Sequence, residues 1–374
     1  MKTRIAGLCQ LVALTLLVCC CFSVLASAQG SDERVTPRFV VLPAKPAAPG
    51  MEAPSATLAT WNGSFTYNGH VYNYNMVGAD PSTNTSVTVP TFIIPIKIVI
   101  NSGGTQYTFD PMSIPDTDVA SVAGLGVRNT AVAATITSPI FDTTTDYVQG
   151  GVDLGATQYL DAFQRGNFWS IVQNNPNTHV LVGGPTILPE QTLVVPAGDG
   201  GIGHPFGTLA GEVDINYFDA QINTIMTQFS QIQPNTFPIF ETANVYLTQG
   251  GCCIGGYHSA TGAQSYSHFT YINHSGNFSM DVSALSHEVG EWVDDPLVNG
   301  YNNVACGILE VGDPLEQGSS GHPYGTWVYP LHHFTYHLQD LTFLRYFGAP
   351  SNTSVNDWWS FQNFPFTTVC QNGG

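Results

Sequence analysis

DVSALSHEVGEWVDDP, residues 281–296, carries the clearest structural signal of this chain. Its apolar residues recur at the three- and four-residue spacing of a helix with one buried face: Val282, Leu285, Val289, Trp292 and Val293. Asp281 or Ser283 can cap the start of such a helix. Asp295-Pro296 ends it, because the residue before a proline avoids the helical region. We therefore predict a largely buried helix over residues 281–294.

The polar residues of this helix have the spacing of a metal site. His287 and Glu291 are four positions apart, so they project from one face of the helix, one turn apart. Imidazole and carboxylate are both ligands of Zn²⁺. Glu288 points about 100° away from His287 around the helix axis, so it can lie beside an ion as a general base. The pattern is the zincin motif H-E-x-x-H with glutamate in place of the second histidine.

A metal site of this kind needs a third ligand from elsewhere in the chain. Glu310 follows Glu291 by 19 positions (310 − 291), which resembles the separation at which gluzincin metallopeptidases place a glutamate ligand. The resemblance implies that Glu310 completes a metal site with His287 and Glu291. Asp313 would then accept a hydrogen bond from the ring of His287. In the alternative arrangement Asp313 is the ligand and Glu310 supports it.

Four short segments resemble a known family. Residues 286–291 (SHEVGE), followed by Asp295-Pro296 and by residues 310–313 (EVGD), resemble the SHELAE…NP…EIGD block of the plant phosphate-induced, EXORDIUM-like proteins. They also resemble bacterial secreted proteins of unassigned function. Upstream, residues 253–258 (CIGGYH) resemble the CGFH segment of the plant family. The resemblance covers residues 245–314 and implies a zincin-like fold around the site.

The resemblance leaves the activity and the disulfide pairing open. The plant proteins are best known as cell-wall growth-related proteins and not as proven peptidases. They carry a cysteine directly after EIGD, where this chain has Pro314 and Leu315, so their disulfide pairing cannot be transferred. The β-rich front of the chain has no clear match in that family.

His258, at the end of the CIGGYH segment, is a candidate catalytic residue. It can donate a hydrogen bond to a developing oxyanion, as histidine or tyrosine does in metallopeptidases. The alternative is a loop histidine that is bonded to the backbone. A second group, His332, His333 and His337, lies near the end of the chain, and His333 and His337 would share one face of a helix. For that group, ordinary packing is the alternative to a second metal site.

The first 28 residues have the pattern of a signal peptide. Lys2 and Arg4 give a positive start, residues 8–25 are almost wholly apolar, and Ala26-Ser27-Ala28 offers a cleavage site. We therefore expect a secreted, extracellular protein. The alternatives are a membrane anchor and a lipoprotein attached through a cysteine of the apolar run. No later stretch is long and apolar enough to span a bilayer, so we expect no membrane contact after cleavage.

The mature chain is strongly acidic. The whole chain has 9 Lys and Arg against 27 Asp and Glu, a net charge of −18. Lys2 and Arg4 leave with the signal peptide, so the mature charge is −20 (−18 − 2). Such a surface repels phosphate groups, so we expect neither nucleic acid nor an anionic membrane as a partner.

Four cysteines remain after cleavage: Cys252, Cys253, Cys306 and Cys370. An even number in an exported protein indicates disulfides, and four cysteines allow three pairings. A bond between adjacent cysteines is strained and rare, so we expect Cys252 and Cys253 to reach distant partners. A zinc site built from cysteines is the weaker alternative, because no pair has C-x-x-C spacing.

The pattern of elements predicts an α+β fold. Residues 29–57 are rich in Pro and Ala and indicate an extended leader, residues 58–150 are β-rich, and residues 151–374 form a mixed, zincin-like part that holds the site helix. The last two parts can form one domain. Expected strands cover residues 65–67, 71–74, 91–100, 180–182, 192–195 and 237–248, with Pro95 marking an edge or a bulge. Expected helices cover residues 157–172, 214–229, 281–294 and 332–347.

Two functions compete for this site. In the first, the protein is a secreted zinc-dependent hydrolase, a metallopeptidase that acts on extracellular peptides or proteins, with Glu288 as general base for a metal-activated water. In the second, it is a non-enzymatic secreted protein that binds a cell-wall or other carbohydrate polymer and carries a structural metal. Ca²⁺ is disfavoured because His287 is a poor ligand for a hard cation. The hydrolase requires Glu288 beside an open cleft, whereas a structural site requires Glu288 packed among side chains.

Overall fold

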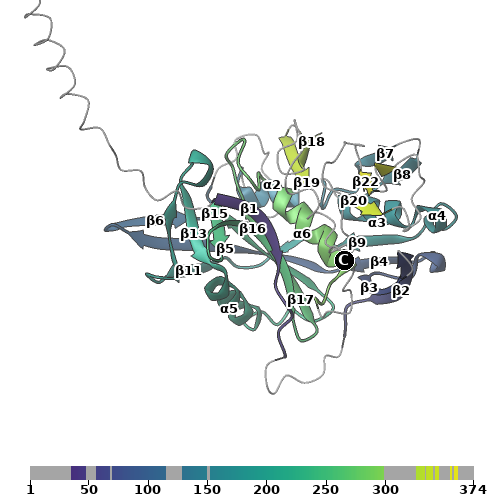
Figure 1. Cartoon of the computed structure of the whole chain (residues 1–374), viewed down its shortest axis with the longest axis horizontal. Coiled ribbons are helices and arrows are strands. Elements are labelled where there is room, and N and C mark those ends of the chain that lie inside the picture. The colour runs from purple at the N-terminus through teal and green to yellow at the C-terminus, as the bar shows by residue number, and fades with distance from the viewer. Residues whose placement is uncertain are drawn as a thin grey trace, which may run out of the picture. The chain divides into compact units, whose positions relative to one another are not determined.

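An eleven-stranded sheet is the framework of the part of the chain that the structure describes (Figure 1). This computed structural model describes residues 35–47, 56–67, 70–114, 129–149, 152–298, 326–332, 334–339, 342–344, 354–355 and 358–360. The strands follow one another across the sheet in this order: β10 (Thr186–Ile187), β5 (Thr91–Ser102), β14 (Phe237–Ala243), β17 (Gln264–Tyr271), β16 (Cys252–Thr261), β15 (Val245–Thr248), β13 (Ala210–Asp214) and β12 (Gly200–Gly203). Three more strands join it, β1 (Val35–Val41) beside β16, and β6 (Thr105–Phe109) and β11 (Gln191–Val195) beside β5.

Smaller elements surround this sheet. The other strands pair as β2 (Thr60–Tyr67) with β3 (His70–Val77), β4 (Ser86–Val89) with β9 (His179–Val182), β7 (Asp146–Gln149) with β8 (Val152–Ala156), β18 (Thr326–Leu331) with β19 (Phe334–Gln339), and β22 (Trp358–Ser360) with β20 (Thr342–Leu344) and β21 (Ser354–Val355). The helices are α2 (Ala131–Ile136), α3 (Tyr159–Asn167), α4 (Trp169–Val172), α5 (Ile215–Met226) and α6 (Ser283–Asp294), with 3-10 turns at Pro81–Thr83 and Pro205–Gly207. A large mixed sheet with few helices is an α+β fold, as predicted.

The sheet separates two hydrophobic clusters, and one long helix belongs to each. Phe218 of α5 lies in one cluster, and Leu285 and Trp292 of α6 lie in the other. Because side chains alternate along a strand, neighbours in β14 serve different clusters: Ile239 packs with α6 and Phe240 with α5. Figure 1 accordingly places α5 and α6 on opposite sides of the sheet.

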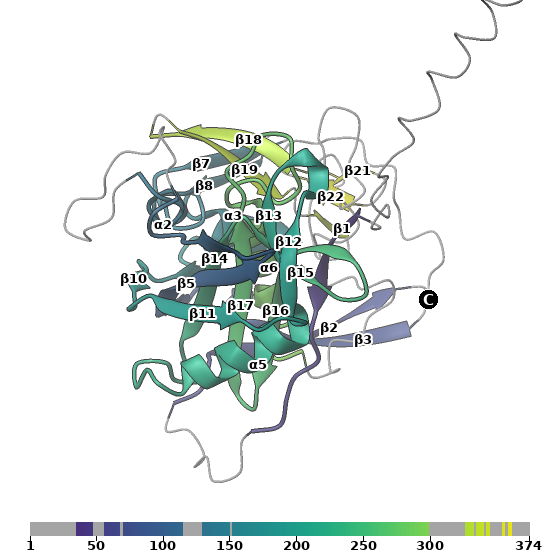
Figure 2. The ribbon, with the colours of Figure 1, turned by 90° about the vertical axis from the view of Figure 1, so that its left-hand side faces the viewer.

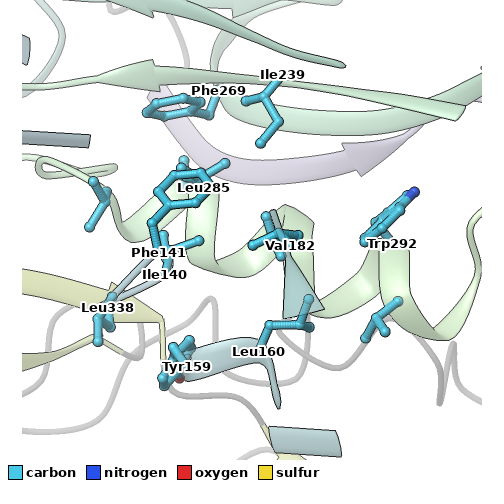
Figure 3. Close-up of a cluster of buried hydrophobic side chains, with 14 of the residues drawn as sticks. Ile140, Phe141, Tyr159, Leu160, Val182, Ile239, Phe269, Leu285, Trp292 and Leu338 are labelled. Atoms are coloured by element: carbon cyan, nitrogen blue, oxygen red, sulfur yellow. The ribbon is translucent and has the colours of Figure 1, made fainter. Parts of the chain in front are cut away.

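α6 is buried along its whole length. Figure 3 shows it between Ile239 and Phe269 of the sheet on one side, and Leu160 of α3 and Leu338 of β19 on the other. Each of its residues is buried, including the charged ones. The predicted helix over residues 281–294 is therefore confirmed within two residues, and it has little contact with solvent.

The start of α6 differs from the prediction. Neither Asp281 nor Ser283 caps it, since Val282 is the N-cap residue and makes no side-chain cap hydrogen bond. Asp281 instead accepts hydrogen bonds from the backbone N–H of His337, at 2.8 Å, and of Val282, at 2.6 Å. Its other carboxylate oxygen lies 2.6 Å from His337 Nδ1. Asp281 thus joins α6 to β19, where a simple cap was expected.

The end of the described chain corrects a predicted helix. Residues 332–347 were expected to be helical, but β18 and β19 form an antiparallel hairpin there. Phe334, Tyr336 and Leu338 alternate with more exposed residues and are buried against the α6 cluster. Tyr336 fixes this strand by donating a hydrogen bond to the Ala134 carbonyl oxygen, at 3.0 Å. The burial of every second residue is typical of a strand. The spacing of leucines that suggested a helix was therefore misleading.

Pro95 lies inside the sheet, so the edge, one of its two predicted positions, is wrong. On one side of β5, Pro95 is the last residue paired with β14, where it faces Glu241. On the other side β10 pairs with Phe92 and Ile93, and β11 begins at Ile96 (Figure 2). A proline has no N–H to donate, so it fits the position at which β5 changes partner.

The predicted strand over residues 237–248 is two strands. Asn244 interrupts it with a φ of 54°, a left-handed conformation that asparagine tolerates better than most residues. β14 before it pairs with β5 and β17, whereas β15 after it pairs with β13 and β16. β5 comes from the expected β-rich front and β14 from the expected zincin-like part, so those two parts share one sheet.

The expected leader and the pairing of the cysteines also differ from the prediction. The leader contributes β1 to the sheet, and Phe39 of β1 is buried. Cys252 and Cys253 form a disulfide with each other, so the expectation of distant partners is wrong. They are the first two residues of β16. Cys306 and Cys370 lie outside the described residues, as does the expected signal peptide.

Trp292 should be a main source of stability. It is fully buried, its ring stacks on Phe237 with centroids 3.8 Å apart, and its Nε1 donates a hydrogen bond to Ser265 Oγ at 3.0 Å. We expect Trp292→Ala to lower the free energy of unfolding by about 3–5 kcal/mol in urea titrations, since it leaves a large cavity. Trp292→Phe keeps the stacking and should cost less. The control Val194→Ala, at a residue 58% exposed, should change it by less than about 0.5 kcal/mol. Equal losses in all three variants would contradict this.

His268 should make stability depend on pH. It lies on the α5 side of β17, where its ring packs on Phe218, and burial lowers its pKa from 6.5 to about 3. As the pH falls from 6.5 towards 3, the unfolded chain gains a proton that folded His268 does not bind, so the free energy of unfolding decreases. His268→Gln should weaken this dependence in urea titrations across that range. An unchanged slope would show that His268 is protonated in the folded protein.

Candidate metal centre

β16 and α6 bring the candidate site together. Gly256 of β16 lets the helix approach closely, because a Cβ atom there would lie only 2.7 Å from Glu288 Oε1 and 2.9 Å from its Cγ. His258 is two positions further along the same strand, so its side chain points to the same face of the sheet. The glycine and the histidine together place an imidazole against the carboxylates of α6.

Four ionisable side chains meet at this contact. His258 Nδ1 lies 3.4 Å from Glu288 Oε2 and 3.6 Å from Glu291 Oε2. On the other side of Glu291, its Oε1 lies 2.8 Å from His287 Nε2. Glu291 thus has an imidazole on each side. Glu288 and Glu291 are three positions apart on α6, and such residues are neighbours on a helix surface.

The centre is closed to solvent. His258, His287 and Glu288 are 0% exposed and Glu291 is 1% exposed. Phe39 of β1 contributes to this closure, since its ring stacks on that of His287 with centroids 3.8 Å apart and an angle of 29° between the rings. Burial of two carboxylates without compensating charge is costly, so their environment must supply positive charge or strong hydrogen-bond donors.

The state of His258 follows from its burial. Burial, and to a lesser extent the neighbouring His287, lower the pKa of His258 to about 3, and the Asp295 backbone offsets part of this shift. The ring is therefore neutral at ordinary pH. A neutral imidazole has a lone pair to offer to a metal, but it contributes no positive charge to balance the two carboxylates.

His258, Glu288 and Glu291 can hold a metal ion. One possible ligand atom from each lies within 4.8 Å of the others, and this is the one group of three or more such residues found in the described part of the chain. Two carboxylates and a neutral imidazole match a divalent cation in charge and in donor type. The donor set alone does not select among the divalent metals that accept oxygen and nitrogen ligands.

The structure brings some of the predicted site residues together, whereas others lie outside the described residues. His287 and Glu291 lie together, as their spacing indicated. His258 was considered as a donor to an oxyanion and Glu288 as a base beside the ion. The structure places both in one group of possible metal ligands with Glu291. Glu310 and Asp313 lie outside the described residues, so their predicted roles stay predictions. His337, of the second histidine group, pairs with Asp281 instead.

Sequence reasoning missed Phe39 and Gly256. Phe39 stood in a segment expected to lead up to the folded body, where its one short apolar run was the available signal. Gly256 stood in the CIGGYH segment, but no local pattern could show that a helix would approach it. Both depend on which strands pair with β16, which is a property of the whole sheet.

Comparisons with known proteins do not assign this chain to a family. The chain matches no family model, no curated protein and no solved structure. The likeness to the plant phosphate-induced proteins therefore stays a prediction from short motifs. Within the described residues, no helix is long and apolar enough to cross a membrane.

His258 should be required for metal binding. We expect His258→Ala to weaken the affinity for added Zn²⁺ by at least about tenfold in competition with a chromophoric chelator, since it removes one of three donors. His204→Ala is a matched control, because His204 is exposed and is not part of the His258, Glu288 and Glu291 group. Equal zinc affinity in both variants would mean that His258 is not a ligand.

Proposed function

We propose that this chain is a secreted zinc-dependent hydrolase that acts on peptide bonds. The observation that carries the proposal is the position of His258 against α6. The helix has the pattern H-E-x-x-E, which lacks the second histidine of a zincin motif. β16 supplies a histidine at the place where the helix lacks one.

We assign His258 and Glu291 of the His258, Glu288 and Glu291 group to metal binding. We add His287 as a third ligand that an ion would draw in, because its Nε2 lies outside that group but only 2.8 Å from Glu291 Oε1. Glu291 is the natural centre of this set, since its two carboxylate oxygens lie 2.8 Å from His287 Nε2 and 3.6 Å from His258 Nδ1. Two histidines and one glutamate are a donor set known from catalytic zinc sites, and they leave a fourth position for water. Bound zinc there would lower the pKa of that water and polarise a carbonyl group.

Glu288 is assigned to proton transfer. Its carboxylate lies 3.4 Å from His258 Nδ1, so it is next to the donor set. A carboxylate in that place can accept a proton from water and pass it to the leaving amine. If Glu288 were itself a ligand, the site would have two carboxylates, which would cancel the charge of the ion and weaken it as a Lewis acid.

The complete burial of Glu288 counts against the hydrolase, which requires an open cleft beside this residue, and favours a second function. A structural metal would need no access for water, and Glu288 is packed directly against Gly256. In that case the ion would hold α6 to β16 in a non-enzymatic secreted protein that binds a cell-wall or other polymer. The two functions differ in what the loss of the Glu288 charge does.

Glu288→Gln should separate the two functions. For a hydrolase it should keep zinc, measured by mass spectrometry of the metal content, and lower the cleavage of fluorescein-labelled casein by on the order of 10² or more. His287→Ala should lose zinc as well as activity. Glu190→Gln, which alters a carboxylate paired with Lys97, is the matched control and should cleave casein like the wild type. If Glu288→Gln matches the wild type in every assay while His287→Ala unfolds, the metal is structural.

A further inference from the structure

We propose that residues 35–45 occupy the place of a bound peptide at the metal centre. On this view the centre takes an extended polypeptide that lies along β16 and inserts an apolar side chain where Phe39 now lies. The cleavage of such a peptide rests on the proposed function, but its binding does not.

Residues 35–45 bind β16 largely through backbone groups. The Leu42 N–H donates to the His258 carbonyl oxygen at 3.3 Å, and the Lys45 N–H donates to that of Ala260 at 2.8 Å. The Gly262 N–H returns a hydrogen bond to the Lys45 carbonyl oxygen at 2.8 Å. Lys45 pairs in parallel with Thr261, so the segment runs alongside the strand that carries His258. A peptide of another sequence can form the same backbone hydrogen bonds.

Phe39 is the residue of this segment that reaches the centre. It is 5% exposed and stacks on His287, and its ring also lies 4.8 Å from that of Phe278. Gly255 leaves room for it, since a Cβ atom there would lie 2.9 Å from Phe39 Cε1. Val40, the next residue, packs with the cluster on the α5 side of the sheet. The segment therefore inserts one aromatic side chain at His287, as a peptide ligand would fill a specificity pocket.

Apart from Phe39, the side chains of β1 are partly or fully exposed, as a replaceable segment requires. Phe39 is its one buried residue, and Val35 is 41% exposed. Residues 35–45 have two further anchors outside the contacts with β16. Arg38 Nη2 donates to the Gln249 carbonyl oxygen at 2.7 Å, and the Ala44 N–H donates to that of Val298 at 3.2 Å. Lys45 also forms an ion pair with the buried carboxylate of Asp219.

Charge favours a basic peptide at this place. Residues 34–45 hold three of the nine Lys and Arg of the chain, namely Arg34, Arg38 and Lys45. Residues 46–374 hold four Lys and Arg against 25 Asp and Glu, a net charge of −21 (4 − 25). A strongly acidic protein attracts basic peptides over a range of about 10 Å at 0.1 M salt. The expected substrate is therefore a basic, extended peptide with an aromatic or large aliphatic residue.

The test uses the full mature chain and a labelled probe peptide, TPRFVVLPAK, which copies residues 36–45. In the wild type the tethered segment competes at an effective concentration on the order of millimolar, so the probe should bind weakly. Phe39→Ala weakens that competitor without altering a residue of the metal centre. We expect it to bind the probe at least about tenfold more tightly than the wild type, measured by fluorescence anisotropy.

Two controls make the result specific. Val35→Ala truncates an exposed side chain of the same strand and should bind the probe as the wild type does. A probe in which alanine replaces the phenylalanine should not bind Phe39→Ala. If Phe39→Ala does not fold by circular dichroism, Arg38→Ala serves instead, because it removes the hydrogen bond to the Gln249 carbonyl and leaves the aromatic ring. Equal affinity of the wild type and the folded variant for the probe would overturn the proposal.

The fate of the probe separates this inference from the hydrolase proposal. Mass spectrometry of the probe after incubation with the zinc-loaded variant has three outcomes. Tight binding with cleavage supports both proposals. Tight binding of a probe that stays intact supports the peptide site and counts against the hydrolase. Cleavage or recovery of the probe without tighter binding to the variant overturns the peptide site.

Discussion

The burial of two glutamates of α6 against β16 is the constraint on which the rest of the centre depends. Glu288 and Glu291 are almost completely removed from water, and an ionised carboxylate in such a place must be compensated. His258, close to both, is neutral because burial lowers its pKa to about 3. A divalent cation would balance the two charges and use the lone pair of the imidazole at the same time. Burial and donor type therefore both fit a metal ion, which the His258, Glu288 and Glu291 group could hold.

The surrounding fold positions this pair of elements. α6 is held from both sides, by β14 and β17 of the sheet and by α3 and β19 (Figure 3). Trp292 of this helix stacks on Phe237. The absence of a side chain at Gly256 sets how near the helix comes to β16. Asp281 ties the start of the helix to His337 of β19. These contacts fix the backbone of both elements, so the four polar side chains meet with little freedom.

Patterns carried within one element were enough to predict α6, α5 and four strands of the sheet, namely β5, β11, β14 and β15, the last two as one strand. The other seven strands of the sheet were not predicted. The spacing of His287 and Glu291 on one helix also predicted that these two side chains would meet. The contact of His258 with α6 could not be predicted in its detail, because it depends on β16 lying between β17 and β15. The same holds for β19, where packing on α2 and α6 outweighed an apparent helical spacing, and for Phe39, which reaches His287 through pairing with a strand more than 200 positions away.

The most direct test of the central claim is an anomalous difference map at the zinc absorption edge, from crystals of the mature protein grown with zinc. The account predicts one strong peak between β16 and α6, about 2.0–2.2 Å from ligand atoms of His258 and Glu291. A zinc peak at other residues, or none between these two elements while both are well ordered, would contradict it. The two carboxylates would then have to be compensated by the protein alone.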